Sequence, residues 1–158
     1  MRLGDYFSKK EKKSLLLPEG IVLGTVLRAF VDFTNPPKIK RFIVIGFNED
    51  NITLASVLIN SELNLNVNYN SELQSHQIPL ECEGKEYLLT DSYVDCSEIH
   101  NIEKQTIEES LQKDPHTAIG KVEKKELNTI IRTIINSEVV KGKYKRKCGL
   151  FDYKFEDE

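Results

Sequence analysis

The alternation of apolar and polar positions divides the chain into a first part typical of β-strands and a second part typical of helices. Between residues 21 and 96, short apolar runs are separated by Pro, Gly and Asn, which interrupt regular structure. These runs predict about six strands, at 21–33, 42–47, 52–59, 77–80, 86–90 and 92–96. Short strands at this spacing are typical of a small barrel or sandwich.

Three polar segments suggest how these strands connect. The Asn/Asp-rich segment 48–51 predicts a hairpin between 42–47 and 52–59, and Glu83-Gly84-Lys85 predicts a second one between 77–80 and 86–90. In residues 63–70, apolar residues alternate with asparagines. This period of two fits a strand, but asparagine is depleted in strands, so an edge strand and a folded loop both stay open. The plainer interpretation is that these asparagine amides form a solvent-exposed face. The functional interpretation is that they form hydrogen bonds with RNA bases.

The clearest periodic signal is helical and lies in residues 127–139. Its apolar residues recur at i, i+3, i+4, i+7, i+8 and i+12: Leu127, Ile130, Ile131, Ile134, Ile135 and Val139. This spacing predicts an amphipathic helix of about four turns, with one apolar stripe facing the barrel or a second subunit. A shorter helix containing Ile107 and Leu111 precedes it and ends before Pro115, and 119–122 is expected as a connector.

Length and composition predict one domain. The 158 residues allow a core at 21–138, flanked by a basic arm at 1–20 and a tail at 139–158 that is basic and then acidic. The net charge of −3 gives no global attraction for nucleic acid. No apolar run has the length of a membrane span or a signal peptide, and the three cysteines form no CxxC motif. We therefore expect a cytoplasmic protein with reduced thiols and no membrane partner.

Three stretches of the sequence share their order and residue types with one known family. They are G-T-V to V-D-F-T-N-P at 24–36, K-R-F-I-V-I at 40–45, and S-Y-V-D-C-S-E-I at 92–99 followed by I-G-K-V at 119–122. They resemble the PemK/MazF (CcdB-like) toxins of bacterial toxin–antitoxin systems. The resemblance spans about 24–138. It implies a mainly β member of the α+β class: a small SH3-like, PemK-type barrel with a C-terminal amphipathic helix packed on it.

The resemblance also implies an activity and partners. Proteins of this family are typically homodimeric, metal-independent endoribonucleases that cut single-stranded RNA and are silenced by an antitoxin. Single-stranded RNA, a cognate antitoxin and a second copy are therefore the expected partners, with no cofactor. The family's arginine falls on Arg41, although Phe42 replaces the proline after it, and the family's Ser/Thr falls on Asn60-Ser61. A second arginine of many members has no equivalent near 92–94, which removes a cation expected at the phosphate.

These residue types suit cleavage of RNA through its own 2′-OH. A guanidinium binds phosphate in a bidentate manner and stabilises the charge of the transition state, the role assigned to Arg41. Ser61 or Asn60 would orient the reacting ribose. His76, just before a strand, is the best alternative for acid–base catalysis.

A basic cluster near the end of the chain is the strongest local feature expected to bind RNA. It consists of Lys141, Lys143, Tyr144, Lys145, Arg146 and Lys147. Charge runs are usually solvated, so a tail without a ligand is the plainer interpretation.

Plainer roles exist for the other candidates as well. Arg41 suits a solvated strand end, Ser61 a turn, and His76 a structural position. Asp32 suits either a hydrogen-bonded structural carboxylate or part of an acid–base pair. Two rival functions follow: a PemK-like barrel without catalysis that binds protein or RNA, and a structural subunit whose Ile-rich helix is an interface.

Overall fold

The computed structural model describes residues 21–50, 52–63 and 68–156, so the predicted basic arm and half of the asparagine alternation, at 64–67, lie outside the described residues. One seven-stranded sheet is central. Its strands are β1 (Thr25–Val31), β2 (Lys38–Phe47), β3 (Thr53–Asn60), β4 (Gln77–Leu80), β5 (Ser92–Asp95), β6 (His100–Glu103) and β7 (Ala118–Lys121). All pairings are antiparallel, in the order β4-β5-β3-β2-β1-β7, with β6 also paired to β3.

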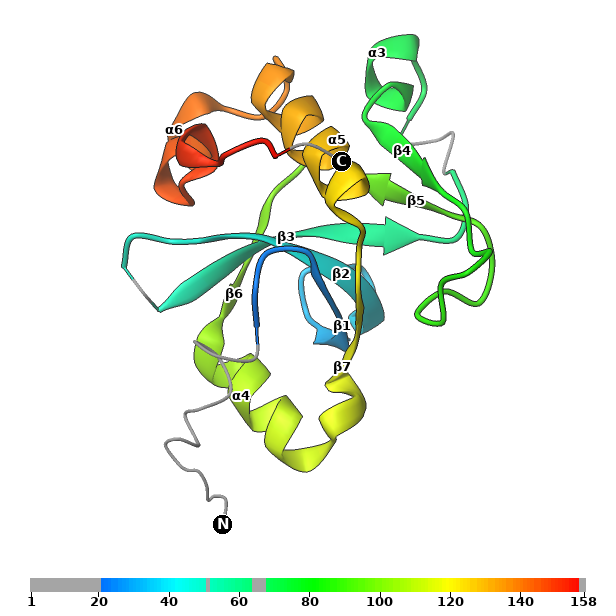
Figure 1. Cartoon of the computed structure of the whole chain (residues 1–158), viewed down its shortest axis with the longest axis vertical. Coiled ribbons are helices and arrows are strands. Elements are labelled where there is room, and N and C mark those ends of the chain that lie inside the picture. Colours follow the sequence, from blue (N-terminus) through cyan, green and yellow to red (C-terminus); the bar gives the residue numbers. More distant parts are fainter. Residues whose placement is uncertain (1–20, 51, 64–67, 157–158) are drawn as a thin grey trace.

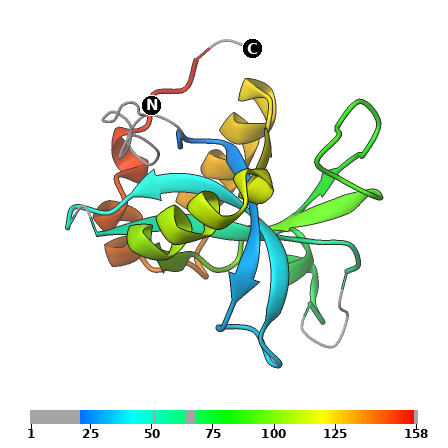
Figure 2. The same ribbon diagram turned by 90° about the horizontal axis from the view of Figure 1, so that it is seen from below.

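Helices flank this sheet on both faces. They are α3 (Ser71–Gln74), α4 (Lys104–Lys113), α5 (Lys124–Asn136) and α6 (Gly142–Lys147), with 3-10 turns η1 (Pro115–Thr117) and η2 (Leu150–Asp152). The two longer helices, α4 and α5, lie on opposite sides of the sheet (Figures 1 and 2). The protein is therefore a mixed α+β fold with an antiparallel sheet. Within the described residues no pairing joins β4 to β7, so the sheet is not closed into a barrel.

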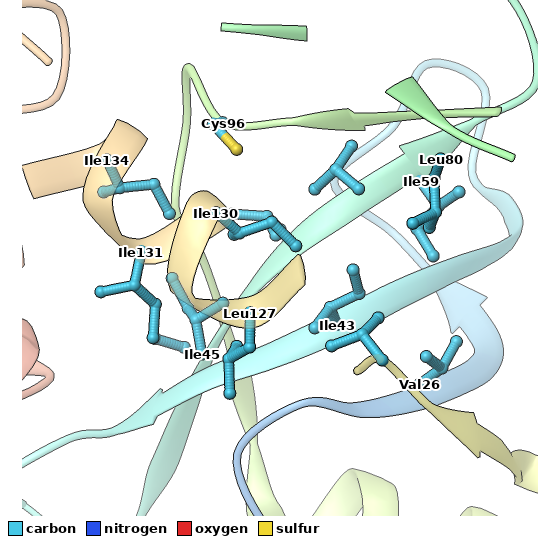
Figure 3. Packing of buried hydrophobic residues seen from close by; sticks show 14 of the residues in the cluster. Val26, Ile43, Ile45, Ile59, Leu80, Cys96, Leu127, Ile130, Ile131 and Ile134 are labelled. Carbon is cyan, nitrogen blue, oxygen red and sulfur yellow. The ribbon is translucent and has the colours of Figure 1, made fainter. Parts of the chain in front are cut away.

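The core forms where the two helices cover the sheet. Strand β2 is buried on both faces, with Phe42 in the core cluster that contains α4 residues and Ile43 in the cluster that contains α5 residues. The predicted amphipathic helix is confirmed: α5 turns Ile130 and Ile134, both 0% exposed, toward the sheet (Figure 3). The expectation for Val139 is wrong, because it lies beyond the end of α5 and is 40% exposed.

The segment between β4 and β5 differs from its prediction. Strand β4 pairs with β5, and residues 86–90 belong to the loop between them, so the second predicted hairpin is wrong. The Asp91 carboxylate accepts the Cys82 N–H at 2.9 Å, which ties together the base of this loop. Tyr87 and Leu88 are buried in the core cluster on the α5 side. These two apolar side chains are therefore buried from a loop and not from a strand.

Residues 139–156, expected as a tail, pack against the rest of the fold. Cys148 and Leu150 are buried in the core cluster that contains α5. Gly46 lies so close to the Cys148 backbone that a side chain there would collide with it. Farther on, Tyr153 Oη donates to Asn128 Oδ1 at 2.7 Å. The C-terminal part of the chain is therefore fixed to α5 and β2.

Candidate functional site

The face of the sheet that carries α5 is covered at one end only. Val26 and Ile43 are paired across β1 and β2 and are fully buried in the α5-side core. Two residues farther from α5 along each strand, Arg28 and Arg41 form the next pair on the same face. Arg41 is also paired with Ile59 of β3. The register therefore places two guanidinium-bearing residues side by side where the helix no longer covers the sheet.

These two arginines line a hollow of about 350 Å³. Its other walls come from β2, the end of β3 and the loop before β5. The lining residues are Arg28, Ile39, Lys40, Arg41, Ile59, Ser61, Leu88, Leu89, Thr90 and Ser92. Cations and hydroxyl groups provide the polar side chains of this lining, which contains no carboxylate. We call this hollow the arginine site; its chemistry suits a phosphate group.

The Arg41 side chain is held in place by the loop before β5. Its Nε donates to the Tyr87 carbonyl oxygen at 3.0 Å. The Tyr87 ring in turn lies against Gly120, where an added Cβ would come within 2.6 Å of the ring. No described residue forms a hydrogen bond with the terminal nitrogens of Arg41. One edge of the guanidinium is therefore fixed and the other can bind an anion.

Lys40 and Asn60 form a pair at the rim of the arginine site. Lys40 Nζ donates to Asn60 Oδ1. Burial lowers the pKa of Lys40, the nearby charge of Lys38 lowers it further, and Asp95 acts in the opposite direction. Lys40 is therefore a better proton donor than an exposed lysine. Asn60 reaches the site only through this hydrogen bond.

The predicted catalytic residues are only partly brought together. Arg41 and Ser61 line the same hollow. His76 does not line it. The His76 ring is buried, and its nitrogens lie 2.7 Å from Glu72 O and 2.7 Å from Ser137 Oγ. The plainer interpretation of His76, a structural histidine, therefore fits its surroundings.

Arg28 and Lys40 line the arginine site but were not selected from the sequence. The sequence analysis found no second arginine near 92–94; the structure places Arg28 of β1 directly opposite Arg41. A signal was present: Arg28 is the only charged residue in the apolar run 21–31. A charge inside such a run needs a solvent-exposed or functional position, and Arg28 is exposed.

The basic cluster lies mainly on α6, not in an extended tail. Most of its side chains are exposed, namely Lys141, Lys143, Tyr144, Arg146 and Lys147. Lys145 differs, because it is buried and its Nζ donates to the carbonyl oxygens of Ile135 and Ser137, both at 2.8 Å. The assignment of Lys145 to RNA binding is thus corrected: it satisfies carbonyls at the C-terminal end of α5.

We expect Lys145→Met to lower the free energy of unfolding by about 1–3 kcal/mol, because two buried carbonyls would lose a charged donor. The matched control is Lys143→Met on the exposed side of α6, which should change stability by no more than about 0.5 kcal/mol. Urea unfolding followed by circular dichroism measures both variants. Equal stability of the two would contradict the structural role of Lys145.

Neither a family model nor a curated protein matches the chain. In residues 21–50, 52–63 and 68–156, no three His, Cys, Asp or Glu side chains are grouped to hold a metal ion. Among the helices of these segments, none has the length and apolar character needed to cross a membrane.

Proposed function

We propose that this protein is a PemK/MazF-like, metal-independent endoribonuclease that cuts single-stranded RNA in the arginine site. The observation that carries the proposal is the cross-strand pair of Arg28 and Arg41 in one hollow with Ser61. It supplies the second cation that the family resemblance lacked. In this proposal the antiparallel sheet with α5 is an SH3-like, PemK-type barrel left open between β4 and β7. The protein acts in the cytoplasm under the control of an antitoxin.

The proposed reaction uses the RNA's own 2′-OH as nucleophile. Its oxygen forms a bond to the adjacent phosphorus while the bond to the 5′-oxygen breaks, leaving a 2′,3′-cyclic phosphate and a 5′-OH. Arg28 and Arg41 stabilise the charge that develops on the phosphate oxygens. Ser61 orients the ribose, the 2′-OH proton passes to solvent, and the Lys40 ammonium donates a proton to the departing 5′-oxygen.

The exposed cations of α6 are proposed to hold more distant phosphates of the RNA strand. Such contacts depend on salt, because each neutralised phosphate releases counterions. They give affinity without sequence preference. A second copy of the chain is proposed as a further partner on the family resemblance.

The test is incubation of the purified protein with single-stranded RNA in the presence of EDTA, with new ends mapped chemically. We expect new 5′-OH ends paired with 2′,3′-cyclic phosphates, because no step of the proposed reaction uses a metal ion. Cleavage that disappears with EDTA, or that leaves 5′-phosphates, would contradict the mechanism. A parallel incubation of Arg41→Ala, purified in the same way, controls for contaminating nucleases.

One observation favours a second candidate, an inactive PemK-like module that binds RNA or protein. The lining of the arginine site contains neither a histidine nor a carboxylate, so Lys40 is its best acid–base group. A binding module needs the two arginines but no proton transfer. It predicts RNA binding without cleavage in the same incubation.

A further inference from the structure

We propose that Phe30 and Ile39 form a platform on which a base of single-stranded RNA stacks, next to the phosphate held by Arg28 and Arg41. The inference rests on the proposed function, since it names how the same site recognises its substrate. The sequence analysis gave neither platform residue a role.

Strand register places the platform directly beside the arginine pair. Phe30 follows Arg28 by two residues on β1, and its partner across the strands is Ile39, two residues before Arg41 on β2. Residues two apart on a strand share a face and lie about 7 Å apart. The apolar pair and the cationic pair are therefore consecutive steps on one face of the sheet.

The side chains of Phe30 and Ile39 are exposed to solvent and are not covered by other parts of the fold. Phe30 is 62% exposed and Ile39 is 53% exposed, although the strands around them are mostly buried. The nearby Phe33 is different, because its ring stacks on His100 with 4.2 Å between centroids. No described ring stacks on Phe30. Phe30 is thus an aromatic side chain beside the arginine pair whose face is available.

Charge decides on which side of Phe30 the RNA backbone lies. Ile39 lines the arginine site together with Arg28 and Arg41. Phe30 lines a second hollow, of about 340 Å³, together with Asp32 and Glu103, whose carboxylates repel phosphate. The phosphate is therefore expected on the Arg28 side of the Phe30 ring. Cations next to an exposed aromatic ring are the combination that binds single strands, with phosphate on the cations and a base on the ring. One nucleotide can make both contacts, because its base is separated from its phosphate only by the ribose.

The test uses the absence of tryptophan from the sequence. Phe30→Trp places a single reporter on the platform, and Phe151→Trp places one on η2, where Phe151 is 51% exposed. Each protein is titrated with a 2′-O-methyl oligonucleotide, which cannot be cleaved through its 2′-oxygen, and with an abasic oligomer of the same length. We expect the oligonucleotide to quench Phe30→Trp emission, the abasic oligomer to leave it unchanged, and Phe151→Trp to respond to neither.

Affinity gives the second measurement. Phe30→Ala should weaken binding of the oligonucleotide roughly 5- to 150-fold, the range expected for loss of one stacked base. The salt dependence should stay as in the wild type, because no phosphate contact is lost. Arg28→Ala should instead reduce the salt dependence.

Three outcomes would overturn the inference. Wild-type affinity of Phe30→Ala overturns it and leaves the proposed function standing. Emission of Phe30→Trp that changes with protein concentration in the absence of RNA shows that a second copy covers the platform. If the wild type binds no single-stranded RNA at all, the proposed function fails and the inference fails with it.

Discussion

Arg41→Ala is expected to lower the rate of RNA cleavage by roughly 100- to 1,000-fold, the usual effect of removing one preorganised donor to the transition state. Arg41 is fixed by its hydrogen bond to the Tyr87 carbonyl oxygen, so its remaining donors need no reorganisation during the reaction. Single-turnover cleavage of a short RNA with protein in excess measures this rate without interference from product release.

Variants of two other arginines show whether the loss of cleavage is specific to the arginine site. Arg28→Ala should reduce cleavage in the same direction, because Arg28 is the cross-strand partner of Arg41. Arg132→Ala is the control, since Arg132 lies on α5 over the Phe155 ring and does not line the arginine site. Wild-type cleavage by Arg41→Ala would remove the arginine site from the reaction. Cleavage by neither the wild type nor any variant, with binding that depends on Arg41, would establish the inactive binding module.

Ile130→Ala is expected to lower the free energy of unfolding by about 2–5 kcal/mol, the cost of a cavity in a packed core. Ile130 is 0% exposed and lies in the stripe that joins α5 to the sheet (Figure 3). The matched control is Ile52→Ala, because Ile52 is 60% exposed and its truncation leaves no cavity. Urea unfolding of both variants gives the comparison.

The stability of Ile130→Ala also tests whether the apolar stripe of α5 packs on the sheet. A change of about 0.5 kcal/mol or less, similar to that expected for Ile52→Ala, would mean that α5 does not pack on the sheet as described. A destabilisation that depends on protein concentration would instead indicate that the stripe stabilises a second subunit.

Local patterns in the sequence predicted the parts of the fold with strong periodicity. The spacing from Leu127 to Ile134 identified α5 and its buried face. Apolar residues that recur every three to four positions lie on one face only if the segment is a helix. The continuous apolar run at 42–47 correctly indicated a strand buried on both faces. Arg41 and Ser61 were selected as candidates from the resemblance, and they line one hollow.

Two short strands gave no such signal. Strand β6 has Ile102 as its single large apolar residue, and β7 has only Ile119, so neither shows an alternation. Both strands form because β3 and β1 offer them free edges. Tyr87 and Leu88 were assigned to a strand because burial of a loop and burial of a strand require the same apolar side chains.

The sequence by itself therefore determined the long helix, the central hairpin and one arginine of the candidate site. Only the tertiary structure decided that Arg28 pairs with Arg41, that Lys145 is buried at the end of α5, and that His76 is held away from the arginine site. The physical reason is distance along the chain. Hydrophobic periodicity shows which residues share a face within one helix or strand. Strand register and helix packing bring together residues that are far apart in the sequence, and no local pattern predicts these contacts.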